Sequence, residues 1–149
     1  MEWINDLKGK TIGLDTAPLI YFIEENSKYI EAVSGFFEAM DKEDFLVVTS
    51  TVTLLEVLIH PLRNNNNELA TEYRDILLSS KLITLEVSNS IAERAAQLRA
   101  DYNIRTPDAI QISAALDMGA TYFLTNDIRL PVIPAIKMLS LDSFQHGRH

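Results

Sequence analysis

Short apolar runs alternate with helix-forming segments along the chain, and this alternation constrains the fold more than any other feature. The runs have the length of buried strands and comprise Thr11–Leu14, Phe45–Thr49, Leu82–Leu85, Thr121–Leu124 and Ile136–Met138. Helices are predicted between them over Pro18–Glu24, Lys28–Asp41, Thr53–Ile59, Glu68–Ser79, Ile91–Tyr102 and Pro107–Met118. Because parallel strands need crossover helices, the pattern predicts an α/β fold, a three-layer α/β/α sandwich with a mostly parallel central sheet.

The length of the chain suits one domain spanning residues 1–149, with a substantial core. The run Asn64–Asn67 follows Pro61 and is expected to form a surface loop between two helices. The chain has no cysteine, which excludes disulfides and zinc–thiolate sites. No apolar run approaches the roughly 18 residues that span a bilayer, and the first residues lack a signal pattern, so we expect no membrane association and a cytoplasmic location.

The net charge is −8, with 13 Lys and Arg against 21 Asp and Glu. This balance opposes nonspecific binding to phosphates and argues against a DNA-coating role. A nuclease function is compatible with it if some of the acids gather where cations neutralise them.

Two acids directly follow predicted strands. Asp15 comes after the first strand, and Asp127 stands in the same relation to the strand that ends at Leu124. In parallel α/β sheets, ligands bind in the crevice at the carboxyl ends of the strands, where both side chains are expected. The alternative is that each Asp caps the turn or helix that follows it.

A third acid lies at a predicted helix start. Thr106 suits the N-cap and Pro107 the first helical position, which places Asp108 in the first turn. Compensation of the helix dipole could explain an acid there. The rest of this helix is almost all apolar or small, however, so its N-terminus should point into the structure and make a functional role more plausible.

The fourth acid, Glu56, lies within the aliphatic helical segment Thr51–His60. An ionised carboxylate in such surroundings needs an ion pair, hydrogen bonds or a metal. The alternatives are an exposed helix edge or a salt bridge, for example to Arg63.

Considered together, these acids predict a cation site. Clustered carboxylates repel one another, and a pocket of several is stable at neutral pH chiefly when a hard divalent cation occupies it. Ligands that are all oxygen suit Mg²⁺ or Mn²⁺ rather than zinc or copper. Hydrolysis of phosphodiester bonds is the chemistry that most often uses such a site.

The ordered motifs that carry these acids resemble the PIN-domain family, and within it the VapC-like toxin ribonucleases of type II toxin–antitoxin systems. The matching segments are Leu14–Thr16 with Leu19–Tyr21, Thr49–Thr53 leading to Glu56, Arg105–Ala115, and Phe123–Asp127. They occur in family order and span nearly the whole chain.

The resemblance implies a PIN-like sandwich with a Mg²⁺- or Mn²⁺-dependent endoribonuclease site. Asp15, Glu56, Asp108 and Asp127 match the family's four acids, which would serve as catalytic and metal-binding residues. Thr125 and Asn126 match its polar residues at the strand end, and Thr16 and Thr125 would orient carboxylates. The resemblance also implies RNA as the substrate, a cognate antitoxin protein as a partner, and a homodimer. Ala17 departs from the family pattern, in which many members have Asn or Ser.

Several points stay open at this stage. Arg105 and Arg129 flank the acids and could contact phosphate, or each could form a salt bridge. The chain could instead be a stand-alone RNA-processing nuclease, or a catalytically silent PIN-like module that binds RNA or protein. An aspartyl-phosphatase with Asp15 as nucleophile would need a second acid two residues later, where Ala17 stands.

Overall fold

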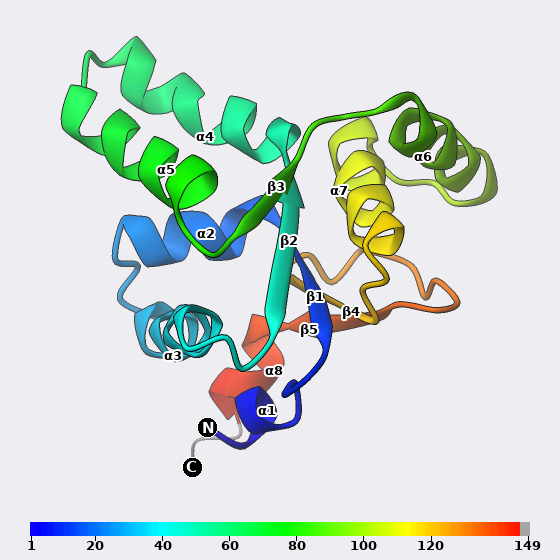
Figure 1. Ribbon diagram of the computed structural model, residues 1–149, viewed down its shortest axis with the longest axis horizontal. Coiled ribbons are helices and arrows are strands. Elements are labelled where there is room, and N and C mark those ends of the chain that lie inside the picture. The colour runs from blue at the N-terminus through cyan, green and yellow to red at the C-terminus, as the bar shows by residue number, and fades with distance from the viewer. Residues whose placement is uncertain (147–149) are drawn as a thin grey trace.

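Five parallel strands form one sheet in the order β3-β2-β1-β4-β5. The computed structural model describes residues 1–146 (Figure 1). The strands are β1 (Thr11–Leu14), β2 (Leu46–Ser50), β3 (Ile83–Leu85), β4 (Tyr122–Thr125) and β5 (Lys137–Ser140). The predicted α/β fold with a parallel sheet is therefore confirmed, and strand boundaries differ from the expected ones by two residues at most.

Helices cover both faces of the sheet (Figure 1). On one face lie α2 (Thr16–Ile23), α3 (Ile30–Asp41), α4 (Thr51–Arg63) and α5 (Asn67–Ser79). On the other lie α6 (Asn89–Asp101) and α7 (Thr106–Asp117). Two short helices, α1 (Glu2–Asn5) and α8 (Leu141–His146), were not predicted because they are too short to show a helical period.

Successive residues of β1 face opposite sides of the sheet, so the strand contributes to the hydrophobic clusters on both faces. Ile12 and Leu14 belong to the cluster packed with α3, whereas Gly13 faces α7. A Cβ at Gly13 would lie 2.5 Å from Cβ of Ala115 and 2.7 Å from Cδ1 of Phe123. The close approach of α7 to the sheet therefore requires glycine at this position.

Two local expectations are wrong. Helix α4 does not end at Ile59 but continues through Pro61 to Arg63. The helical backbone hydrogen bonds continue past the proline, as shown by the Asn64 N–H, which donates to the His60 carbonyl at 3.1 Å. Thr106 is not the N-cap of α7, which starts at Thr106 itself. The Thr106 hydroxyl instead accepts a hydrogen bond from Nη1 of Arg99 at 2.9 Å.

The order of the strands determines that Asp15 and Asp127 lie close together. β1 lies between β2 and β4, so the chain proceeds to one side of β1 first and to its other side later. This reversal creates a crevice at the carboxyl ends of β1 and β4, as in other open parallel sheets. Asp15 and Asp127 follow these two strands and so reach the same edge. None of the helices within residues 1–146 is long and apolar enough to cross a membrane.

Candidate active site

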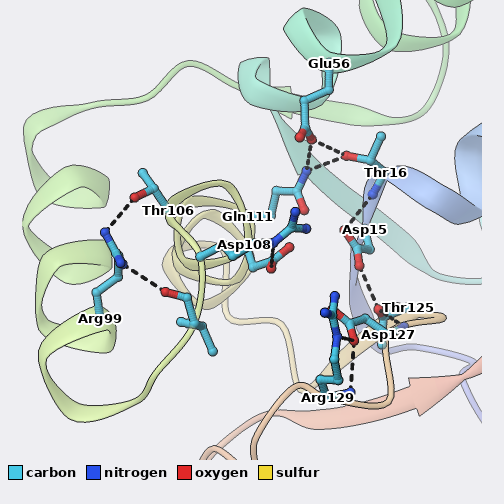
Figure 2. A network of polar contacts seen from close by, with 12 residues as sticks. Asp15, Thr16, Glu56, Arg99, Thr106, Asp108, Gln111, Thr125, Asp127 and Arg129 are labelled. Carbon is cyan, nitrogen blue, oxygen red and sulfur yellow. Dashed lines mark hydrogen bonds and ion pairs between the residues drawn. The ribbon is translucent and has the colours of Figure 1, made fainter.

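All four sequence-predicted acids line one cavity of about 380 Å³ at this edge of the sheet (Figure 2). Asp15 enters from the start of α2, Glu56 from α4, Asp108 from the first turn of α7, and Asp127 from the loop after β4. The other lining residues are Thr16, Ala17, Ile20, Tyr21, Arg105, Asn126 and Arg129. Tertiary structure thus brings together residues that are up to 112 positions apart in the sequence.

Asp15 is buried, and both of its carboxylate oxygens accept a hydrogen bond. It caps α2, its Oδ1 accepting from the Thr16 backbone N–H at 2.8 Å, while its Oδ2 accepts from the Thr125 hydroxyl at 2.7 Å. Burial raises the pKa of Asp15, the two hydrogen bonds oppose this rise, and the negative charges of Asp108 and Glu56 add to it. The capping interpretation and the site interpretation are therefore both compatible with its geometry.

Asp108 is buried and paired with an exposed arginine. Its Oδ2 lies 3.2 Å from Nε of Arg105, whose side chain is 69% exposed against 8% for the carboxylate. The hydrogen bond that Arg105 donates to Asp108 raises the pKa of Arg105, so the guanidinium stays charged. Asp108 points its charge into the cavity and has a cation at the rim.

Asp127 forms a forked pair with Arg129. Nε of Arg129 lies 3.0 Å from Oδ1 of Asp127, and Nη2 lies 3.2 Å from Oδ2. The hydrogen bonds from this guanidinium lower the pKa of Asp127, which keeps the carboxylate ionised. The Asp127 N–H donates to the Thr125 hydroxyl at 3.0 Å, so Thr125 connects Asp127 with Asp15.

Glu56 has neutral partners instead of the salt bridge that was considered. Its Oε1 accepts from the Thr16 hydroxyl at 2.7 Å and lies 3.3 Å from Nε2 of Gln111 (Figure 2). Sequence reasoning missed Gln111, which is 1% exposed on α7. The signal was present, because Gln111 is a long polar side chain within an apolar helix, the same pattern that singled out Glu56.

Asn126 lines the cavity, but within residues 1–146 its side chain forms no hydrogen bond with any of the four acids. Its Nδ2 donates to the hydroxyls of Tyr21 and Tyr29, at 3.2 and 3.0 Å. The two tyrosine rings stack with their centroids 4.5 Å apart. Asn126 therefore anchors the strand end to an aromatic pair on the neighbouring helical layer.

The donor chemistry of the cavity fits a hard divalent cation. Every acidic ligand candidate offers oxygen, and Asp15 is buried beside two other negative charges. Among residues 1–146, however, no group of three His, Cys, Asp or Glu side chains is close enough to enclose a metal. Mg²⁺ commonly binds one or two carboxylates and keeps several waters, so a site for it does not need three such side chains.

Comparison with known proteins gives one family and one fold. A family model of the PIN domain matches residues 12–136. Among curated protein sequences, none matches the chain significantly.

Several solved structures are similar in fold. The VapBC2 complex from Rickettsia felis, bound to a DNA fragment from its promoter, has a TM-score of 0.70 and 21% identity, covering 87% of this chain and 98% of that one. A toxin–antitoxin complex from Klebsiella pneumoniae has a TM-score of 0.65 and 20% identity, covering 89% and 98%. VapC20 of Mycobacterium tuberculosis, a sarcin–ricin loop cleaving toxin, has a TM-score of 0.62 and 15% identity, covering 76% and 87%. At these identities the likeness shows the fold alone.

Proposed function

Because the chain belongs to the PIN-domain family, whose members are typically nucleases, we propose that it is a Mg²⁺- or Mn²⁺-dependent endoribonuclease that hydrolyses RNA phosphodiester bonds. The observation that carries the proposal is the convergence of Asp15, Glu56, Asp108 and Asp127 on one cavity. The cavity lies where the strand order reverses, which is the usual place for a ligand in this class of sheet.

The acids divide into cation ligands and one residue, Glu56, that could also act on the attacking water. Asp15 and Asp108, the two buried carboxylates, would hold the ion; Asp127 would contribute less, because Arg129 already occupies both its oxygens. A bound divalent ion supplies a water of lowered pKa and neutralises charge on the leaving oxygen. Glu56 would bind metal or orient the attacking water from the opposite wall. The nucleophile is water, so no covalent enzyme intermediate is required.

Arg105 and Arg129 are the positive groups at the cavity rim. Their side chains are 69% and 78% exposed, and each keeps unused donors beyond its ion pair. A guanidinium can bind a phosphate oxygen and a carboxylate at once because its donors point in several directions. We propose that they contact RNA phosphate next to the scissile bond, which offsets the net charge of −8 locally.

The test uses the purified protein without a partner. Structured and single-stranded RNAs are incubated with Mg²⁺, with Mn²⁺ or with chelator, and Asp15→Asn and Asp108→Asn are compared with Asp75→Asn, an exposed Asp on α5. We expect cleavage only with metal, loss of cleavage in both site variants, and wild-type rates for Asp75→Asn. Cleavage that persists in chelator, or survives both site substitutions, would refute the metal-nuclease proposal.

We further propose that the nuclease is the toxin of a toxin–antitoxin pair, acts in the cytoplasm as a homodimer and is silenced by an antitoxin protein. The support is that similar structures are toxin–antitoxin complexes. Expression of the chain alone should arrest growth, and co-expression with the product of an adjacent short reading frame should relieve the arrest. Growth unaffected by an active enzyme would favour a stand-alone RNA-processing nuclease instead.

One observation favours a second candidate, a catalytically silent module that binds RNA or protein. Asp108 and Asp127 are each neutralised by an arginine, so their charge does not require a metal. Such a module would bind RNA equally well in chelator and in Mn²⁺, and would cleave it in neither. The same incubation series therefore separates the two functions.

A further inference from the structure

Gln111 connects three elements at the back of the cavity. Its Nε2 lies 2.6 Å from the Thr16 hydroxyl on α2, and 2.9 Å from the Thr53 hydroxyl and 3.3 Å from Oε1 of Glu56 on α4. We propose that Gln111 is a positioning residue, which orients Glu56 for RNA cleavage by fixing the direction of the Thr16 hydroxyl. The inference rests on the proposed nuclease function.

The direction of the hydrogen bonds follows from counting hydrogens. An amide nitrogen has two, and the two shortest contacts assign them to Thr16 and Thr53. Each hydroxyl, now an acceptor from Gln111, has its own hydrogen free for another partner. Thr16 donates to Glu56 at 2.7 Å, and Thr53 donates to Thr49 at 2.8 Å. Thr49 in turn donates to the Leu14 carbonyl at 3.2 Å, immediately before Asp15.

The charge of Glu56 fixes which way the amide points. Rotating the amide by half a turn would place its carbonyl oxygen against the Glu56 carboxylate, which is unfavourable because both groups only accept hydrogen bonds. In the observed orientation, Oε1 of Gln111 is buried and accepts no hydrogen bond from residues 1–146. A buried acceptor without a partner destabilises the fold, so packing alone would favour an apolar residue, as at the neighbouring Ala109 and Ile112. This cost points to a requirement beyond stability.

The experiment combines Gln111→Met, which keeps the length of the side chain and removes its donors, with Thr16→Val in a double-mutant cycle. Thr16→Ser is the conservative rescue, and Ser113→Ala is the control, a buried polar residue in the same helix that contacts no acid in the described part of the chain. The measurements are kcat and KM for metal-dependent RNA cleavage, and thermal unfolding.

We expect Gln111→Met to lower kcat by about 10- to 100-fold, the usual effect of removing a group that orients a metal-site carboxylate, with KM within about twofold. The double variant should be no slower than Thr16→Val alone, because both changes interrupt the same chain of hydrogen bonds. Thr16→Ser should recover most of the kcat that Thr16→Val loses, and Ser113→Ala should cleave at near the wild-type rate. A kcat for Gln111→Met within about twofold of wild type, or multiplicative losses in the double variant, would overturn the proposal.

A second measurement does not depend on activity. The side-chain amide resonances of Gln111, assigned by triple-resonance NMR in the wild-type protein, should shift in Thr16→Val and Glu56→Gln but not in Ser113→Ala. Unchanged resonances would overturn the proposed chain of hydrogen bonds even if Gln111→Met does not fold. If the resonances shift but wild-type protein cleaves no RNA, the nuclease function fails while the contact between Gln111 and Thr16 stands.

Discussion

The hydroxyl of Thr125, at the end of β4, donates to Oδ2 of Asp15, at the end of β1, over 2.7 Å. The two residues are 110 positions apart in the sequence; Thr125 ends β4, and Asp15 directly follows the neighbouring strand β1. This bond stabilises the ionised form of Asp15 against a burial that raises its pKa. It also connects Asp15 with Asp127, whose N–H donates to the same hydroxyl.

Replacing Thr125 with Val keeps the shape of the side chain and removes this donor. Asp15 then has one hydrogen bond fewer, its pKa rises further, and it becomes a poorer cation ligand. We expect RNA cleavage and Mn²⁺ affinity to fall by about 10- to 100-fold. Thr125→Ser, which keeps the hydroxyl, should restore both. Equal rates of RNA cleavage by Thr125→Val and Thr125→Ser would show that this hydroxyl does not contribute to the site.

Asp15→Asn should stabilise the metal-free protein at neutral pH. Because burial raises the folded-state pKa above its usual value of 3.8, the folded protein binds more protons than the unfolded one, and stability falls as pH rises from 3.8 through the raised pKa. Asn does not ionise, so the variant does not lose stability in this way. In chelator, the unfolding temperature of Asp15→Asn minus that of the wild type should increase as the pH is raised from about 4 to about 7. Asp75→Asn serves as the control, and a pH-independent difference would contradict the assignment.

Arg129→Met tests whether Arg129, at the rim of the cavity, contacts RNA. The ion pair with Asp127 is largely exposed on the arginine side and screened by solvent, so we expect little change in the free energy of unfolding. If Arg129 contacts one phosphate, RNA affinity should fall and the slope of log affinity against log salt should decrease by about 1. Arg74→Met, on the exposed side of α5, is the matched control. An unchanged salt slope would remove Arg129 from the RNA-binding surface.

Gly13→Ala tests the approach of α7 to β1. The added methyl group would lie 2.5 Å from Cβ of Ala115, so either the helix or the strand must move. We expect a loss of about 1–3 kcal/mol in the free energy of unfolding, measured by urea denaturation. Adding Ala115→Gly should recover part of this loss, so that the two substitutions are not additive. Additive effects would mean that the contact does not limit the packing.

The arrangement of strands and helices could be predicted from the sequence, because buried strands and crossover helices have different lengths and periods. The first strand was predicted with its observed boundaries, Thr11–Leu14. Prediction was poorest where local rules competed with tertiary contacts. Helix α4 was expected to end at Ile59 but ends at Arg63, and Arg99 binds the Thr106 hydroxyl that was expected to cap α7.

The sequence by itself also indicated that Asp15, Asp108 and Asp127 could meet, since residues that follow parallel strands or start a buried helix share one edge of the sheet. Glu56 was added to them by the family resemblance. Only the tertiary structure decided how each acid is held: Thr125 binds Asp15, arginines pair with Asp108 and Asp127, and neutral groups hold Glu56. Gln111 shows the physical reason. Its partners Thr16 and Thr53 are 95 and 58 positions away, and hydrogen bonds over such separations depend on how helices pack, which no local pattern specifies.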